Sequence, residues 1–329
     1  MIPDWARMNR YKFVDYATQG YVAFVALLVL VFHGERLAAW RWVLLGHAVG
    51  FGLIHLLIQL AARFPRNPAL TFLRHFYPIL LYTAFYRETE LLNQMFHAGF
   101  LDAHFLRLEP KLFGMQPGLE LMLRYPSRWL AELLYAAYFS YYLMIGGVGL
   151  LLLWRDRRQF AHFVSLVSFV FYVCYTIYIF VPVVGPRIVY RGLVDEPLPP
   201  DVVPAVSTEA PASVQSAVMF RVMGWIYDHF EAAGAAFPSS HVAVALTTVY
   251  FSFRYLRRIR YVHLVAALLL CVSTVYGRYH YVMDVAAGIG VAAILVPLGN
   301  WLYRKCGGDL EELGTAAAVA EAATHHTAR

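Results

Sequence analysis

Two histidines and one aspartate have the residue types and the spacing of a phosphoryl-transfer site. His241 ends the stretch Phe237-Pro238-Ser239-Ser240-His241, and Asp284 follows His280 by four residues. On a helix this spacing puts the imidazole and the carboxylate on one face. The carboxylate would then hold the imidazole in one tautomer and support positive charge on it. Together with nearby arginines, such groups could transfer a phosphoryl group without a metal ion.

The composition indicates that membrane helices position these residues. Of the 329 residues, 60% are hydrophobic and 15% are charged, whereas a soluble domain is usually less than half apolar and about a quarter charged. The net charge is +6. We interpret this surplus as arginines that flank membrane segments rather than as a nucleic-acid site. The three cysteines form no motif, and no carboxylate cluster suggests a metal, so no disulfide framework, metal or cofactor is expected.

Apolar segments predict an all-α, polytopic membrane bundle of about eight transmembrane helices. They cover residues 17–34, 42–62, 70–86, 129–153, 160–182, 241–256, 262–279 and 284–303. The positive-inside rule then places both termini in the cytoplasm. The same threading brings Arg187, His241 and His280 to the non-cytoplasmic face, which supports one shared site.

Two long segments lie outside the predicted spans on that face. Residues 87–128 have apolar residues at helical spacing and predict an interfacial helix that breaks at Gly114 and Pro117. Residues 188–237 begin with a Pro-rich loop and continue as an amphipathic stretch, which we interpret as a lid or an interfacial element. We expect Asp102, His104 and Glu109 to form a solvated face of the helix within residues 87–128 rather than to bind a ligand.

These segments predict three regions. Residues 1–128 would hold N-terminal membrane helices and the interfacial segment, and residues 129–303 the catalytic membrane domain. Residues 304–329 read as a flexible cytoplasmic tail.

Two motifs that flank the sixth and seventh predicted spans resemble those of the type 2 phosphatidic acid phosphatase superfamily. Pro238-Ser239-Ser240-His241 is similar to its P-S-G-H motif, with Ser240 in place of glycine. Ser273, His280 and Asp284 match its S-R-x-x-x-x-x-H-x-x-x-D motif at the Ser, His and Asp positions. The resemblance covers roughly residues 129–303 and implies a helix bundle with the core of that superfamily.

Further similarity points to one branch of the superfamily. The segment Pro182-Val183-Val184-Gly185-Pro186-Arg187 and an upstream segment with Asp102, Glu109 and Leu112-Phe113-Gly114 carry it. They are similar to the inositol phosphorylceramide synthases and their bacterial relatives. This resemblance implies phospholipid or sphingolipid-like head-group chemistry.

The sequence departs from the superfamily at positions that bind phosphate. Its first motif is K-x-x-x-x-x-x-R-P. Aligning Arg187 with the arginine puts Phe180 at the lysine and Ile188 at the proline, and Thr274 stands where the third motif has arginine. Two cations of the family are therefore missing. Arg278 could replace one of them, because a guanidinium binds phosphate oxygens in a bidentate manner.

The resemblance implies a phosphohistidine mechanism, and these residue types suit it. His280 would attack phosphorus as a neutral imidazole, and Asp284 would orient it and stabilise the positive charge that develops. His241 would protonate the leaving group and then activate water or an acceptor alcohol. The groups that would hold the phosphoryl oxygens are Arg187, Arg278, Ser239, Ser240 and Ser273.

Two reactions on a membrane lipid phosphate remain open at this point. A hydrolase would pass the phosphoryl group to water, and a transferase would pass it, or a head group that carries it, to an alcohol. A third possibility is a non-catalytic scaffold, pseudoenzyme or transporter. The spans carry few charges at mid-depth, which disfavours a transporter.

Overall fold

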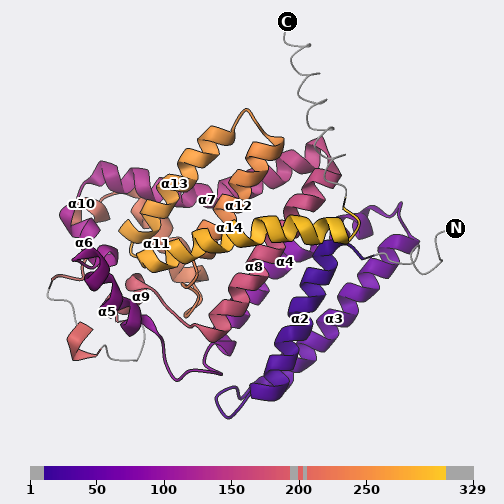
Figure 1. Ribbon diagram of the computed structural model, residues 1–329, viewed down its shortest axis with the longest axis horizontal. Coiled ribbons are helices and arrows are strands. Elements are labelled where there is room, and N and C mark those ends of the chain that lie inside the picture. The colour runs from indigo at the N-terminus through magenta and orange to yellow at the C-terminus, as the bar shows by residue number, and fades with distance from the viewer. Residues whose placement is uncertain (1–10, 193–198, 203–205, 309–329) are drawn as a thin grey trace, which may run out of the picture.

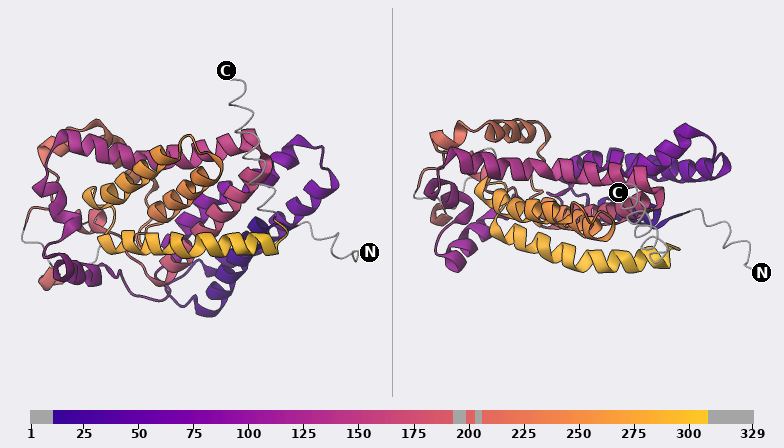
Figure 2. Two further views of the ribbon diagram at one scale, coloured as in Figure 1. Left: turned by 45° about the horizontal axis from the view of Figure 1, so that its top comes forward. Right: turned by 90° about the horizontal axis from the view of Figure 1, so that it is seen from above.

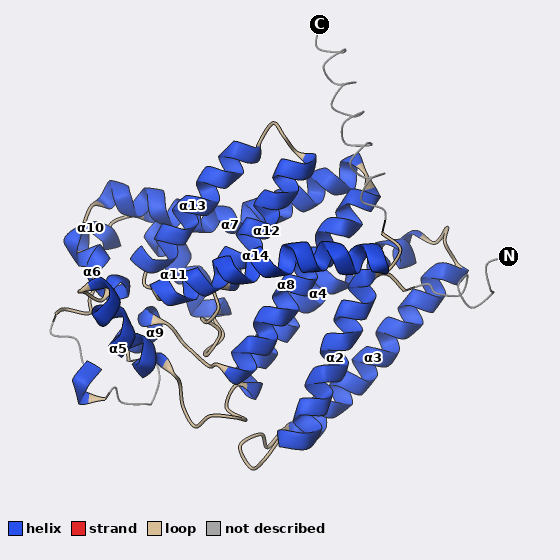
Figure 3. Cartoon of the chain, viewed as in Figure 1, coloured by secondary structure: helices blue, strands red, loops and turns tan. Residues whose placement is uncertain are grey.

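The computed structural model describes residues 11–192, 199–202 and 206–308. This part of the chain forms helices and loops and contains no β-strand, so the all-α prediction is confirmed (Figure 3). The long helices are α2 (Phe13–Phe32), α3 (Trp40–Arg63), α4 (Pro68–Leu92), α7 (Arg128–Arg155), α8 (Arg157–Phe180), α12 (Ser240–Tyr255), α13 (Arg260–Tyr276) and α14 (Val282–Lys305). The shorter ones are α5 (Asp102–Phe113), α6 (Pro117–Arg124), α9 (Pro186–Tyr190), η1 (Pro200–Val202), α10 (Ala212–Gln215) and α11 (Val218–Phe230).

Each of the eight predicted spans corresponds to one long helix. In the described residues, five of these helices are long and apolar enough to cross a membrane: α2, α3, α7, α8 and α14. Helices α12 and α13 have 16 and 17 residues and are shorter than a full span, and α4 is long enough but more polar. The chain is therefore an integral membrane protein, with fewer full-length spans than the sequence predicts.

Helix α12 lies at the centre of the bundle. It packs against α7, α8, α13 and α14, and both views of Figure 2 show α12 and α13 between α7 and α14. Helices α2 and α3 form a hairpin at the periphery, which is attached mainly through α2 to α8 (Figure 1). Because α12 packs against these four long helices, its first turn, which carries His241, lies within the bundle.

The short helices α5, α6, α9 and α10 gather over one end of the bundle (Figure 1). Helix α5 ends at Gly114, which takes the left-handed conformation with φ of 67°, and α6 begins at Pro117. A glycine at this position tolerates positive φ without strain. The predicted helix and its break are therefore confirmed.

The predicted solvated face of α5 is wrong for two of its three residues. His104 is exposed, but Asp102 is 3% exposed and Glu109 is fully buried. Both carboxylates accept hydrogen bonds from backbone N–H groups of distant segments. Their partners are far away in the sequence, so the local pattern of α5 does not reveal them.

The connection between α8 and α12 contains α9, η1, α10 and α11. Helix α11 covers the predicted amphipathic stretch and packs against α7. Parts of the Pro-rich loop, at 193–198 and 203–205, lie outside the described residues. Residues 309–329 also lie outside them, and with them most of the predicted tail.

Candidate active site

The turn between α13 and α14 presents His280. The carbonyl oxygen of Thr274 accepts hydrogen bonds from the backbone N–H groups of Tyr279 (2.9 Å) and His280 (3.1 Å). Arg278 has a positive φ of 66°, which is uncommon for a residue with a side chain. This tight turn reverses the chain within a few residues and brings His280 directly before α14.

The His280 imidazole is paired with Asp284 in the way the spacing predicts. Its Nδ1 lies 3.3 Å from Oδ2 of Asp284, which also accepts the backbone N–H of Tyr281 at 2.8 Å. When Nδ1 donates to the carboxylate, Nε2 carries a free lone pair, and this atom is buried without a partner. Burial lowers the pKa of His280 to about 4, so the imidazole is neutral at physiological pH.

His241 lies in the first turn of α12, close to His280. The two rings have centroids 5.7 Å apart. The Nδ1 of His241 is buried without a hydrogen-bond partner. The rings of Tyr138, Tyr141 and Tyr227 surround His241, with centroids 5.2, 4.7 and 6.4 Å from it. A single phosphoryl group could therefore contact both imidazoles.

The two serines before His241 join the second motif to the third. The backbone N–H of Ser239 donates to the carbonyl oxygen of Asp284 at 3.0 Å, and its hydroxyl caps α12 by accepting from Val242 at 3.3 Å. The backbone N–H of Ser240 donates to the Tyr178 hydroxyl at 3.3 Å. A helix N-terminus favours anions, but both of these N–H groups already have partners, so phosphate binding by the two serines stays a prediction.

The hydroxyl of Ser273 is used inside its own helix. It is buried in α13 and donates to the carbonyl oxygen of Leu270 at 3.0 Å. Its hydrogen bond goes to the main chain of its own helix and not to His241 or His280. In this conformation its oxygen supports the end of α13.

Arg187 belongs to α9, and its guanidinium is held by two carboxylates of the α11 segment. It donates to Glu231 and to Asp228, the latter at 2.5 Å. Its guanidinium carbon also lies 5.5 Å from the ring centroid of Tyr227 and 5.8 Å from that of Tyr279. Because Tyr227 also faces His241, Arg187 lies beside the histidine pair, but with its charge already compensated.

The guanidinium of Arg278 binds main-chain oxygens and not the carboxylates that hold Arg187. It donates to the carbonyl oxygens of Thr208 and Leu119, the latter at 3.3 Å. Burial lowers the pKa of Arg278. The main chains of Arg187 and Arg278 are joined by an N–H···O bond of 2.5 Å, but their side chains bind different partners. Phosphate binding by Arg278 stays a prediction.

Helix α5 braces the site, and sequence reasoning missed this role. Asp102 accepts hydrogen bonds from the N–H groups of Val184 and Gly185 and from the Tyr281 hydroxyl, each at 2.9 Å. Glu109 accepts from the N–H groups of Val282 and Met283. One helix therefore fixes both the segment before Arg187 and the segment after His280. The resemblance in this region was the only signal that could have indicated it.

The carboxylates of Asp228 and Glu231 were also missed. Their i, i+3 spacing at the end of an amphipathic helix was the available signal, but the partner, Arg187, lies more than forty residues earlier in the chain. In the described part of the chain, no group of three or more His, Cys, Asp or Glu side chains is arranged to hold a metal ion.

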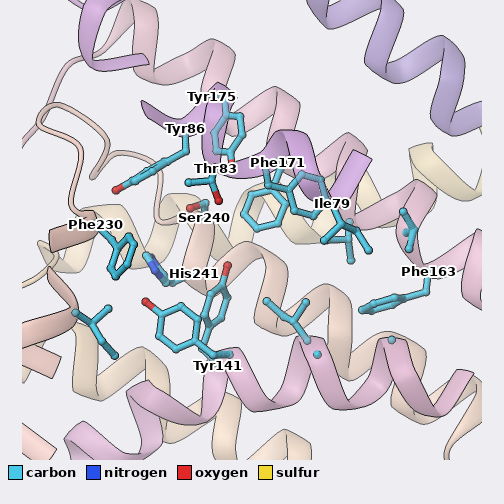
Figure 4. A pocket seen from close by; sticks show the side chains of 18 of the residues that line it. Ile79, Thr83, Tyr86, Tyr141, Phe163, Phe171, Tyr175, Phe230, Ser240 and His241 are labelled. Atoms are coloured by element: carbon cyan, nitrogen blue, oxygen red, sulfur yellow. The ribbon is translucent and has the colours of Figure 1, made fainter. Parts of the chain in front are cut away.

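A cavity of about 630 Å³ lies beside His241. His241, Ser240 and Glu231 line it, together with aromatic and aliphatic residues of α4, α7, α8 and α11. Figure 4 shows His241 and Phe230 at one end and Phe163 at the other. The polar groups of the site therefore lie at the mouth of a long apolar space.

The comparison with known families agrees with the two histidine motifs. A family model described as PAP2 superfamily matches residues 104–298, which is more than half of the chain. The match starts at α5, upstream of residue 129 where the motif resemblance was expected to begin. No curated protein and no solved structure is detectably similar to the chain. With its all-helical core, its membrane-spanning helices and this match, the chain belongs to the PAP2 superfamily.

Proposed function

We propose that the protein is an integral-membrane lipid phosphate phosphatase or phosphotransferase that acts through a phosphohistidine on His280. The observation that carries this proposal is the buried, unpartnered Nε2 of His280, whose ring lies 5.7 Å from that of His241. Membership of the PAP2 superfamily supports phosphatase-type chemistry. The five membrane-spanning helices support a substrate that resides in the bilayer.

In the first step, Nε2 of His280 attacks phosphorus and the bond from phosphorus to the leaving oxygen breaks. The negative charge of the bound phosphate favours a proton on His241, and His241 gives this proton to that oxygen, so the alcohol or phosphate leaves neutralised. Nδ1–H remains bonded to Asp284, whose negative charge stabilises the imidazolium that forms. The product is a phosphohistidine and a neutral His241.

In the second step, His241 takes a proton from water or from an acceptor alcohol. The oxygen attacks phosphorus, the P–N bond breaks, and His280 returns to its neutral form. Ser239, Ser240 and the N-terminus of α12 would hold the phosphoryl oxygens. Arg187 would also bind them after its ion pairs with Glu231 and Asp228 break. Most of the rate enhancement would come from positioning and charge stabilisation.

Hydrolysis and head-group transfer share the first step and differ only in the acceptor. The similarity to the inositol phosphorylceramide synthase branch favours transfer, whereas the superfamily as a whole favours hydrolysis. Purified protein in detergent, given phosphatidic acid, a prenyl phosphate and an inositol phospholipid with and without alcohol acceptors, distinguishes the two. Free phosphate without an acceptor identifies a hydrolase, and a new phosphodiester that needs the acceptor identifies a transferase.

The proposal predicts that His280→Gln abolishes turnover and that a ³²P label from the substrate no longer becomes attached to the protein. His104→Gln is the matched control, because His104 is exposed on α5 and lies outside the proposed site. Equal activity of His280→Gln and wild type would refute the mechanism. No activity of wild type on the whole panel would favour a scaffold or pseudoenzyme.

We also propose that the site faces the non-cytoplasmic side and that both termini are cytoplasmic, on the basis of the positive-inside rule. Glu209 and Arg66 are exposed and fall on opposite sides in this topology. A membrane-impermeant maleimide applied to intact cells should label Glu209→Cys and not Arg66→Cys. The reverse pattern would invert the topology.

A further inference from the structure

The cavity beside His241 is built from two helices of the family core and from one that precedes it. Its walls come from α4, α7 and α8, and α11 closes it near the histidine. The residues of α4 that line it are Phe76, Ile79, Tyr82, Thr83 and Tyr86. All five precede residue 104, where the match to the family begins. This wall is therefore a feature of this chain's own N-terminal region.

The polarity of the cavity changes along its length. One end holds His241 and Ser240 beside Phe230 of α11, which Glu231 follows, and the opposite end is lined by Phe163 (Figure 4). Figure 4 shows this separation, with Phe163 far from His241. A ligand that matches both ends has a phosphate at one end and a hydrocarbon chain behind it.

The length of the cavity exceeds the depth of one leaflet. On α8 its lining runs from Phe160 to Tyr175, which at 1.5 Å per residue is about 22 Å. The hydrocarbon core of a bilayer is about 30 Å thick, so one leaflet contributes about 15 Å. A chain that fills the cavity would therefore be longer than the hydrocarbon depth of one leaflet.

One side of the cavity is open towards the surroundings of the bundle. Ile79 of α4 and Leu150 of α7 line it and are 36% and 64% exposed. Phe230 of α11 is 56% exposed beside the histidine. In a membrane these side chains would meet lipid, so a hydrocarbon chain could enter sideways while its phosphate stays at the surface.

We infer that this cavity binds one long hydrocarbon chain of the lipid phosphate substrate, and that α4 makes the enzyme selective for chain length. The inference rests on the proposed function, since the phosphate of the same lipid would lie between His241 and His280. The volume of the cavity falls within the range of roughly 300–1,000 Å³ that is typical of a pocket for one ligand of moderate size. A long acyl chain and a prenyl chain share the required chemistry.

A pair of neighbouring glycines provides the first test. Gly146 lines the cavity and Gly147 does not, and a Cβ atom added at either position would meet nothing within 4 Å. Gly146→Phe should lower kcat/KM for long-chain phosphates by at least about tenfold and leave short-chain substrates within about twofold. Gly147→Phe should leave both unchanged. Acyl and prenyl phosphates of matched length, assayed in parallel, show which chain the cavity prefers.

The wall formed by α4 is tested in the same way. Thr83→Leu narrows the cavity, whereas Ala84→Leu is a matched control, because both residues are exposed but only Thr83 lines the cavity. Loss of long-chain activity in Thr83→Leu alone would support selection by α4. An unchanged chain-length profile in both Gly146→Phe and Thr83→Leu would overturn the inference while leaving phosphatase chemistry intact.

A second measurement does not depend on turnover. A long-chain alkyl phosphate with a diazirine at the end of its chain should cross-link to the region around Phe160 and Phe163, and an excess of the unlabelled phosphate should suppress the reaction. Cross-links confined to the outer, exposed faces of α3 and α7 would show contact with bulk lipid only and would overturn the inference. If wild type is inactive on every substrate, this experiment still decides whether the cavity holds the chain.

Discussion

Glu231 and Arg187 form an ion pair at the edge of the proposed phosphate site, and the same guanidinium also holds Asp228. Burial raises the pKa of Glu231 to about 7, although the charge of Arg187 works in the opposite direction. Burial also disfavours the ionised form of Asp228, but Asp228 is half-exposed and its bonds to Arg187 outweigh this effect and lower its pKa. The more buried carboxylate is thus the one that can release Arg187 near neutral pH.

This difference predicts a pH-dependent affinity for the phosphate. Above a pH of about 7, Glu231 is ionised and competes with the substrate phosphate for Arg187. Below this pH, Glu231 becomes protonated and its competition with the substrate weakens. Glu231→Gln should therefore lower KM by about fivefold to tenfold at pH 8, and the ratio of wild-type to variant KM should approach one at pH 6. Because both enzymes are compared on one substrate, the ionisation of the substrate cancels.

Asp228→Asn is the control for this prediction. Its lowered pKa keeps it ionised throughout the range from pH 6 to pH 8. Any effect of this variant on KM should therefore be independent of pH within that range. A KM ratio for Glu231→Gln that stays constant from pH 6 to pH 8 would show that Glu231 does not gate Arg187.

Asp284→Asn should reduce kcat by about 10³-fold to 10⁴-fold. One oxygen of Asp284, Oδ2, both accepts the N–H of Tyr281 and contacts Nδ1 of His280. An asparagine whose amide oxygen takes this position keeps both contacts but carries no negative charge, so the imidazolium that forms during phosphoryl transfer loses its stabilisation. Steady-state kinetics of the purified variant measure this effect, and thermal unfolding in detergent shows whether the fold is retained. A folded variant with kcat within tenfold of wild type would contradict the role of Asp284.

Apolar segments could be located from the sequence because a membrane helix is specified by its own composition. The spacing of His280 and Asp284 was equally readable, since both residues belong to one turn. The brace formed by α5 could not be read in this way. Asp102 and Glu109 bind backbone groups 82 and 173 residues further along the chain, and no local pattern encodes such a partner.

The side-chain direction of Arg278 could not be predicted from the sequence either. Its position two residues before His280 suggests that it reaches the phosphate. The backbone, however, takes a left-handed conformation at this residue and the guanidinium binds carbonyl oxygens of Thr208 and Leu119. Proximity in sequence places the main chain, whereas the direction of the side chain depends on α6 and on the loop before α10.

The brace predicts a graded loss of stability. Asp102 is buried and accepts three hydrogen bonds with its two oxygens, so Asp102→Asn replaces one accepting oxygen by a donor, leaves at least one buried N–H group unpaired and should lower the free energy of unfolding by about 2–3 kcal/mol. Tyr281→Phe removes only the hydroxyl bond and should cost about 1 kcal/mol. Denaturant unfolding in detergent measures both. Asp201→Asn, which breaks an exposed ion pair with Arg107, should change nothing measurable. Equal effects of all three variants would contradict the role of the brace.

The distance between the two histidines depends on the close crossing of α12 and α14 at Gly288. A Cβ atom at this position would lie 2.6 Å from the carbonyl oxygen of Ser239 and 3.1 Å from Cβ of Val242. Both contacts belong to the start of α12, two residues before and one residue after His241. Gly288→Ala must therefore push the first turn of α12 away from α14 and increase the separation from His280.

A shift of this kind should lower kcat by about 10²-fold, since a displacement of about 1 Å is enough to disrupt the alignment of reacting groups. Gly290→Ala is the matched control, because a Cβ atom there meets nothing within 4 Å. The Gly290→Ala variant also replaces a glycine of α14. Because alanine has the higher helix propensity, this variant should raise the free energy of unfolding by up to about 1 kcal/mol and leave kcat unchanged. If Gly288→Ala retains wild-type kcat, the spacing of α12 and α14 does not set the geometry of the histidine pair, and the phosphoryl group must be aligned by the side chains around it.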